Sequence, residues 1–371
     1  MLLDATAVPG ERRGVGRYVD SLIPALARAG VDVRVVCRPA DAPLYAGLSG
    51  TEVVSAPGWT TSRPARLGWE QTGLPLVIRR IRPDVVHSPH YTSPLLARTP
   101  LVITLHDATF FTDPSVHTRV KGPFFRTATR LALRRAACCV VPSQATADEL
   151  VRTAGADPAR LQVAHLGVDT TLFRPPDDEE RASARKELGL AEGDRYFAFL
   201  GTLEPRKNVP ALVRGWSAAV RDRQHPPALV LAGGAGWSTS LDAVIHTVPR
   251  PLRVIRPGYL PPHSLPGLLG GAELVVYPSL GEGFGLPVLE AMSCGAAVLT
   301  TRRLALPEVG GDAVAYTEPD ELSIAAAIGA LLDDPTRVSQ LRAAGPTRAA
   351  EFSWDACAAA HVRAYERALA R

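Results

Sequence analysis

Short apolar runs alternate with longer amphipathic stretches along the whole chain. Each run is bounded by glycine, proline or polar residues, as buried strands are, whereas the stretches between them have the apolar spacing of helices. Alternation of this kind is typical of α/β domains with parallel sheets. The runs that we expect to form strands are 1–8, 31–36, 84–87, 101–105, 138–141, 196–200, 228–232, 272–278 and 296–300.

These runs fall into two groups. The stretch between them, 166–177, is rich in proline and acidic residues, which is typical of a linker. A chain of 371 residues is long enough for two domains with separate cores. We therefore expect two Rossmann-like α/β domains with a boundary near residue 170.

Composition narrows the class of protein. Hydrophobic residues make up 46% and charged residues 21% of the chain, as in ordinary soluble proteins. No apolar run reaches the length of a membrane span, and no signal peptide is expected, which predicts a cytoplasmic protein. The five cysteines show no CxxC pair, so we expect reduced thiols and no metal site. A net charge of +4 is too small to indicate nucleic acid as a partner.

The stretch 281–295 carries the strongest chemical signal. It places a glycine-rich turn and a short helix between two apolar runs. Gly283 and Gly285 let a ligand approach the backbone, and the first amides of a helix favour a phosphate. Glu282 and Glu290, eight residues apart, suit sugar hydroxyls, so the stretch predicts a nucleotide-sugar site. The alternative is a capped surface helix with two solvated glutamates.

The spacing Glu-x7-Glu within residues 278–295 resembles the signature of the retaining glycosyltransferases of family four. These enzymes have the GT-B fold, in which two Rossmann-like domains face a cleft. The resemblance implies that Glu282 contacts hydroxyls of the donor sugar and that Glu290 binds the ribose. It also implies that the loop faces the diphosphate, through the amides of Phe284 and Gly285 with Gly283 and Leu286 beside them.

The same resemblance implies a function for each of the two predicted domains. It assigns residues 1–170 to an acceptor domain and 171–352 to a donor domain. The last helix, about 353–371, has Ser353 as its expected N-cap and belongs to the first domain in GT-B enzymes.

Two adjacent cations, Arg206 and Lys207, follow the predicted strand 196–200. A planar guanidinium and a compact ammonium at a strand end suit a diphosphate, although such a pair is often plain surface. The family has Arg-Lys-Asn at this place, bound to the donor diphosphate. Further along, Tyr259 and Leu260 lie in a segment that resembles the one whose backbone reads the nucleotide base.

Candidates in the first domain follow two other predicted strands. His106 and Asp107 follow the run 101–105, where a local hydrogen-bonded pair is the plain alternative. The resemblance places His106 against the donor sugar, and we expect Asp107 to orient it. Gly14 and Gly16 match a family loop that faces the donor phosphates and the acceptor, although Arg13 replaces the first glycine of that loop.

A basic helical stretch near 119–135 suggests a further partner. Arg126, Arg130 and Arg134 have the spacing of one helix face, with Arg119, Lys121 and Arg135 nearby. Such a helix either contacts an anionic membrane from the cytoplasmic side or is an ordinary solvated face.

Taken together, these features predict a retaining glycosyltransferase that needs neither a metal nor a cofactor, because no Asp-x-Asp motif is present and fixed cations face the diphosphate. The loop sequences look most like those of enzymes that use GDP-mannose, and the expected acceptor is a glycan or lipid-linked precursor of the cell envelope. The alternatives are a UDP donor carrying glucose or N-acetylglucosamine, a nucleotide-sugar epimerase of the same fold, and a non-catalytic sugar-binding protein.

Overall fold

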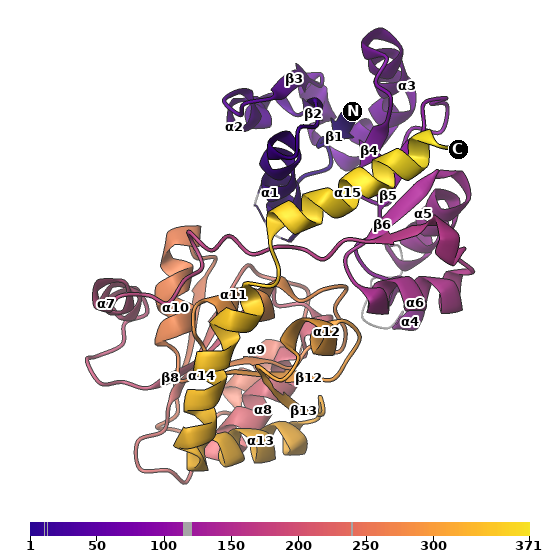
Figure 1. Cartoon of the computed structure of the whole chain (residues 1–371). Coiled ribbons are helices and arrows are strands. Elements are labelled where there is room, and N and C mark those ends of the chain that lie inside the picture. Colours follow the sequence, from indigo (N-terminus) through magenta and orange to yellow (C-terminus); the bar gives the residue numbers. More distant parts are fainter. Residues whose placement is uncertain (11, 13, 114–120, 239) are drawn as a thin grey trace. The chain divides into compact units, whose positions relative to one another are not determined.

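The computed structural model describes residues 1–10, 12, 14–113, 121–238 and 240–371. These residues form two compact units, each an α/β domain with its own sheet (Figure 1). Met1–Gly167 and Ser353–Arg371 make up the first unit, and Val168–Phe352 make up the second. The chain thus leaves the first unit at Gly167, close to the boundary that we expected near residue 170.

The first unit is built on seven parallel strands in the order β3-β2-β1-β4-β5-β6-β7. The strand order changes direction between β1 and β4, which makes this the topological switch point of the sheet. The strands are β1 (Leu2–Asp4), β2 (Val33–Cys37), β3 (Thr51–Ser55), β4 (Val86–Ser88), β5 (Leu101–Thr104), β6 (Cys138–Val141) and β7 (Leu161–Val163).

Helices connect these parallel strands, and the chain returns to this unit through its last helix. They are α1 (Gly14–Arg28), α2 (Ala42–Ala46), α3 (Arg63–Ile81), α4 (Thr109–Thr112), α5 (Lys121–Arg135), α6 (Gln144–Ala154) and α15 (Trp354–Leu369), with short 3₁₀ turns η1 (Pro39–Asp41), η2 (Gly58–Thr61) and η4 (Pro158–Arg160).

The second unit has six parallel strands in the order β10-β9-β8-β11-β12-β13. Its central strands are almost entirely buried, as expected where helices cover both faces of a sheet. The strands are β8 (Tyr196–Leu200), β9 (Ala228–Ala232), β10 (Val254–Gly258), β11 (Leu274–Tyr277), β12 (Val298–Thr301) and β13 (Ala315–Thr317).

The helices of the second unit begin at recognisable caps. Asp177 and Glu180 form a capping box at the start of its first helix, and Asp320 and Asp334 cap two later ones. The helices are α7 (Asp178–Glu187), α8 (Val209–Val220), α9 (Leu241–His246), α10 (Leu265–Gly271), α11 (Leu286–Ser293), α12 (Leu306–Gly310), α13 (Glu321–Asp333) and α14 (Pro335–Ala349), with 3₁₀ turns η5 (Pro205–Lys207) and η6 (Pro262–Ser264).

The first strand is shorter than its apolar run predicts. We expected a strand over 1–8, but β1 ends at Asp4. The Asp4 carboxylate accepts hydrogen bonds from the backbone amide and the hydroxyl of Thr6, at 3.0 and 2.6 Å. This local turn takes the backbone out of the strand, as aspartate side chains commonly do.

A buried network of hydrogen-bonded polar side chains connects α15 to the rest of the first unit. The Tyr18 hydroxyl lies 2.8 Å from the Thr104 hydroxyl and 2.7 Å from Nε2 of His361. Thr104 in turn lies 2.8 Å from His87, whose other ring nitrogen is 2.9 Å from the Tyr365 hydroxyl. These hydrogen bonds connect α1, β4, β5 and α15. Ser353 caps α15 by accepting the amide of Ala356 at 3.1 Å, which confirms the expected cap.

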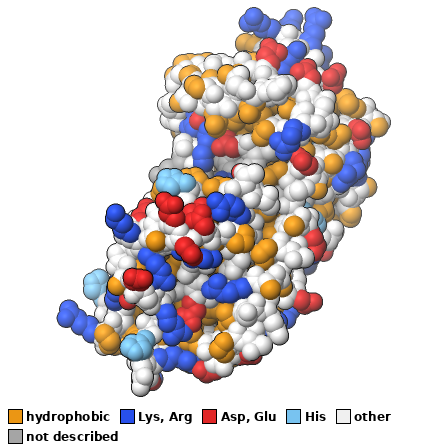
Figure 2. Space-filling model, turned by 60° about the vertical axis from the view of Figure 1, so that its left-hand side comes forward, with side chains coloured by type: hydrophobic (Ala, Val, Ile, Leu, Met, Phe, Trp, Pro, Cys, Tyr) orange, Lys and Arg blue, Asp and Glu red, His pale blue; other side chains and the backbone are white. Residues whose placement is uncertain are grey.

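Basic and acidic side chains are interspersed over the face shown in Figure 2. Within the described part of the chain, every helix is too short or too polar to span a bilayer.

The two buried histidines predict a stability that depends on pH. Burial lowers the pKa of His361 from 6.5 to about 4, and that of His87 well below its usual range. The unfolded chain therefore binds more protons between pH 6.5 and 4, so the free energy of unfolding should fall as the pH falls through that window.

For His361 alone, the loss at pH 5 should be about 2 kcal/mol relative to neutral pH. Urea unfolding at pH 7 and pH 5 measures it: His361→Gln should show a smaller loss than wild type. The exposed His246 provides a matched control, because His246→Gln should keep the wild-type loss. Equal losses in wild type and His361→Gln would contradict the assignment.

Candidate active site

The glycine-rich loop of the second unit joins β11 to α11. Gly285 has φ +111°, and a Cβ on it would lie 2.9 Å from Leu306 Cδ2, so the turn requires glycine. The helix begins at Leu286, and Pro287 is its second residue. The Gly285 carbonyl accepts the amides of Val288 and Leu289, while the amides before them have no acceptor within the helix. This end of α11 can therefore receive an anion.

Phe284 stabilises the loop from its other side. Its ring is buried and packs edge-on against Phe352, with ring centroids 5.8 Å apart. The Phe284 side chain thus serves the core of the unit, and only its backbone remains for the expected contact with a diphosphate. At the other end of α11, Gly295 has φ +70° and follows the C-cap residue Cys294, a position where glycine commonly ends a helix.

The two candidate cations lie on the 3₁₀ turn η5, directly after β8. The backbone carbonyl of Arg206 accepts the Leu280 amide at 2.9 Å and the Ser279 hydroxyl at 3.1 Å. Asn208 ends the turn in the left-handed conformation with φ +57°. These contacts hold η5 against the start of the glycine-rich loop.

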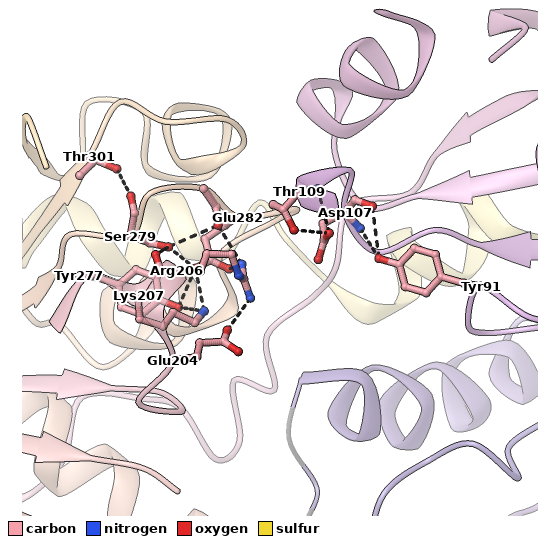
Figure 3. Close-up of polar contacts among 11 residues, drawn as sticks. Tyr91, Asp107, Thr109, Glu204, Arg206, Lys207, Tyr277, Ser279, Glu282 and Thr301 are labelled. Atoms are coloured by element: carbon pink, nitrogen blue, oxygen red, sulfur yellow. Dashed lines mark hydrogen bonds and ion pairs between the residues drawn. The ribbon is translucent and has the colours of Figure 1, made fainter. Parts of the chain in front are cut away.

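Glu282 is the centre of this site (Figure 3). Its Oε2 accepts a hydrogen bond from Arg206 at 2.6 Å. Its Oε1 accepts hydrogen bonds from Lys207, Ser279 and Tyr277, at 2.7, 2.6 and 3.1 Å. The carboxylate is 6% exposed, so the structure brings Glu282, Arg206 and Lys207 together as one buried cluster.

The charges within the cluster determine the protonation state of Glu282. Burial alone would raise the pKa of Glu282, but Arg206 and Lys207 outweigh it and lower that pKa to about 2. Burial lowers the pKa of Lys207, and the charge of Glu282 partly restores it. Glu282 is therefore ionised at neutral pH. A second acid, Glu204, accepts a hydrogen bond from Arg206 at 2.9 Å.

Other predicted donor residues lie elsewhere in the same unit. Glu290 is on α11 and is 2% exposed. Tyr259 and Leu260 follow β10, and Tyr259 is 47% exposed while Leu260 is buried. The carboxyl ends of the parallel strands β8, β10 and β11 share one edge of the sheet. That edge is where open α/β sheets bind ligands.

His106 follows β5 in the first unit. Its Nε2 lies 2.7 Å from the carbonyl oxygen of Pro89, so Nε2 carries the proton. Burial lowers the pKa of His106, which favours the neutral ring with Nδ1 as a hydrogen-bond acceptor. The ring also packs edge-on against Tyr18 at 5.2 Å.

We expected Asp107 to orient His106, but the Asp107 side chain bonds a different residue. Its carboxylate accepts the amide and the hydroxyl of Thr109, at 3.1 and 2.7 Å (Figure 3). Its backbone amide donates to the Tyr91 hydroxyl at 3.0 Å. An aspartate after a strand readily bonds the backbone two residues on, and this local turn occupies Asp107. The Pro89 carbonyl orients the histidine instead.

The expected glycine loop after β1 is described only in part. Gly14 begins α1 and is exposed, and Gly16 is buried, with Arg12 Cδ 3.2 Å from where its Cβ would be. Arg13 and, in the basic stretch, Arg119 lie outside the described residues.

One cluster in the described part of the first unit has the composition of a metal site. Ligand atoms of Asp4, Glu70 and His90 lie within 4.8 Å of one another. Nevertheless, Arg66 donates to Glu70 Oε2 at 2.6 Å and lies 3.2 Å from His90 Nε2. Because this guanidinium already supplies a positive charge to the acids, a divalent cation is disfavoured there.

Sequence reasoning missed Tyr277 and Ser279 as members of the candidate site. Both are fully buried and both donate to Glu282. They stand on either side of Pro278, at the end of the apolar run that forms β11. The sequence feature that could have identified them is the presence of polar residues at the carboxyl end of a buried strand.

The chain matches known families and proteins over nearly its whole length. The model described as Glycosyltransferase Family 4 matches residues 12–172, and the one described as Glycosyl transferases group 1 matches residues 180–348. O-antigen chain mannosyltransferase B of Escherichia coli is 30% identical over 308 residues, covering 82% of this chain and 77% of that protein. The D-inositol 3-phosphate glycosyltransferase of Rhodococcus jostii is 29% identical over 398 residues, covering 97% and 85%.

A solved structure agrees with the fold. The crystal structure of HepE from Anabaena, in complex with UDP and glucose, superposes with a TM-score of 0.76 at 20% identity and covers 98% of each chain. Two parallel sheets, each interleaved with helices, match its architecture. The two family models and the relative at 30% identity show that this chain belongs to the group 1 glycosyltransferases with the two-domain α/β GT-B fold.

Proposed function

We propose that this glycosyltransferase transfers mannose from GDP-mannose to a hydroxyl of a glycan or lipid-linked acceptor, with retention at the anomeric carbon. The observation that carries the proposal is the pairing of Arg206 and Lys207 beside the amino end of α11. The mannosyl donor is supported by the 30% identity to O-antigen chain mannosyltransferase B. The expected role is in synthesis of a cell-envelope polysaccharide or glycolipid in the cytoplasm.

The chemistry follows from stabilising the leaving group. As the bond from the anomeric carbon to the phosphate breaks, negative charge develops on the diphosphate. Arg206, Lys207 and the backbone amides at the amino end of α11 would be preorganised donors for that charge, so no metal is needed. The acceptor oxygen bonds to the anomeric carbon on the same face, and its proton passes to the departing phosphate.

The remaining predicted residues keep their proposed roles. Glu290 binds the ribose, and the backbone at Tyr259 and Leu260 reads the base. His106 contacts a sugar hydroxyl, and its neutral ring would accept that hydrogen bond through Nδ1. This assignment is supported by the Pro89 contact, which places the proton on Nε2.

We also propose that α5 makes a peripheral contact with an anionic membrane. Phe124 and Leu131 are exposed on this helix, at 42% and 38%, and Arg130 and Arg134 are exposed beside them. Arg126 is half-buried, so the basic face is narrower than its spacing predicts. Apolar and basic side chains side by side are typical of helices that lie on membranes.

The nucleotide is tested by thermal stabilisation with GDP, UDP, ADP and dTDP, each in the presence of EDTA. Ligands that bind only the folded state raise the melting temperature with their affinity. GDP should give the largest rise. A rise with UDP alone would show that the donor carries UDP and not GDP. The absence of a rise with any of these nucleotides would contradict the proposed diphosphate site. Incubation with GDP-mannose and no acceptor then separates transfer from epimerisation, since only an epimerase would convert the donor to its epimer.

Lys207→Ala tests the leaving-group role. Loss of a preorganised donor typically lowers kcat by about 10²-fold or more. Release of GDP from GDP-mannose in the presence of acceptor should fall by about that factor. Lys186 lies exposed on α7 of the same unit, so Lys186→Ala should retain the wild-type rate. A Lys207→Ala enzyme that folds and keeps full activity would refute the assignment.

Co-sedimentation with phosphatidylglycerol vesicles tests the membrane contact. Wild type should pellet with these vesicles in low-salt buffer and less so in high salt, because charge attraction is screened. Arg130→Ala/Arg134→Ala should pellet less. Binding that the double variant leaves unchanged would exclude α5 as the contact.

A further inference from the structure

A buried acid on α3 holds the loop that follows β4 in the first unit. Glu70 is fully buried, and its Oε2 accepts hydrogen bonds from Arg66 of the same helix at 2.6 Å and from the Thr92 hydroxyl of the loop at 2.7 Å. Nε2 of His90, also in the loop, lies 3.4 Å from the same oxygen. One carboxylate oxygen therefore connects the helix to two residues of the loop.

The next residue of the helix, Gln71, bonds the loop further along. Its side chain donates to the carbonyl of Ser93 at 3.0 Å and accepts the amide of Leu95 at 2.9 Å. It also donates to Oε1 of Glu70 at 2.9 Å. Residues 90–95 are thus bonded to α3 along their length, and Glu70 is the acceptor at the end nearest β4.

The carboxylate of Glu70 keeps its charge in this buried position. Burial alone would raise the pKa of Glu70, but the contacts with His90 and Arg66 outweigh it and lower that pKa to about 2. Glu70 is therefore ionised at neutral pH, and both of its oxygens act only as acceptors.

The same loop carries the carbonyl group that orients His106. Pro89 follows the last residue of β4, Ser88, and its carbonyl oxygen lies 2.7 Å from Nε2 of His106. This carbonyl and the amide nitrogen of His90 belong to one planar peptide unit. Holding His90 and Thr92 against α3 therefore fixes the direction in which the Pro89 carbonyl points.

We propose that Glu70 is a positioning residue for His106: it fixes the loop after β4, so that the Pro89 carbonyl holds the His106 ring with Nδ1 presented to the donor sugar. Glu70 itself does not touch the sugar. The inference rests on the proposed function, since it needs the proposed contact between His106 and a sugar hydroxyl.

The test compares the affinities for GDP-mannose and for GDP, because the difference between them isolates contacts with the sugar. Glu70→Gln keeps the size of the side chain. However, the amide turns an NH₂ group toward Gln71 or toward Thr92, both of which donate to the carboxylate in the wild type. Calorimetric titration should give an unchanged Kd for GDP and a Kd for GDP-mannose about fivefold higher, as for the loss of one hydrogen bond of ordinary net strength.

A double-mutant cycle with His106→Ala shows whether Glu70 acts through the histidine. Residues that act through a shared partner give effects that do not add. Glu70→Gln/His106→Ala should therefore bind GDP-mannose no more weakly than His106→Ala alone. Additive losses would mean that Glu70 affects sugar binding by another route, and they would overturn the proposal.

Thr92→Val separates the loop contact from any effect of charge. It removes the hydroxyl that donates to Glu70 and lies 3.2 Å from Arg66, but it leaves every charge in place. It also serves if Glu70→Gln does not fold. The Kd for GDP-mannose should rise in this variant as well, and the rise should vanish when His106→Ala is already present. Wild-type affinity for GDP-mannose in Thr92→Val would contradict the proposal.

Glu52→Gln is the matched control. It removes the same charge from the same unit at an exposed ion pair between Glu52 on β3 and Arg34 on β2. Both Kd values should equal those of wild type. An equal weakening of GDP-mannose binding in Glu52→Gln and Glu70→Gln would reduce the effect to net charge and refute the positioning role.

The results also separate this inference from the function on which it rests. If His106→Ala weakens GDP-mannose binding but Glu70→Gln does not, the positioning role alone is wrong. If the wild type binds neither ligand, or if His106→Ala binds GDP-mannose as tightly as the wild type, the proposed sugar contact is wrong and the positioning role fails with it.

Discussion

A buried carboxylate must recover from protein donors what it loses in hydration, and this requirement organises the second unit around Glu282. Its donors come from the end of β11 and the loop that follows it, and from η5, which lies far from them in the sequence. The same contacts that satisfy the acid hold the ends of β8 and β11 in register. The geometry of the candidate site is thus a consequence of burying one charge.

The first unit also buries polar side chains, but these are uncharged. Tyr18, Thr104 and two histidines form a buried polar chain, and burial keeps both imidazoles neutral. Because the Tyr18 ring also packs against His106, the fastening of α15 supports the candidate sugar-contacting histidine. The buried network of the first unit that holds α15 is thus neutral, whereas that of the second unit contains ion pairs.

The sequence predicted most of this fold, because its central strands are apolar runs and its glycines have conformations that no other residue adopts easily. Gly285 and Gly295 both have positive φ, and Ser353 caps the last helix as expected. The strands β3, β7, β10 and β13 were missed, because they lie at the edges of the two sheets and are only partly buried. We expected Asp107 to orient His106, but its carboxylate accepts the amide and the hydroxyl of Thr109, and the sequence alone does not show which of these nearby partners it takes. Tyr277 and Ser279 lie only a few residues from Glu282, but the strand pattern does not show that their hydroxyls converge on its carboxylate.

The first unit is assembled from both ends of the chain, whereas the second is continuous from Val168 to Phe352. During synthesis the second unit is complete before the last helix emerges, because domains fold as their residues appear. Until then the hydroxyl of Tyr18 and the ring of His87 lack their α15 partners. The first unit can therefore complete its buried polar network only after the whole of the second unit has been synthesised, so its folding depends on a segment that is made after another domain.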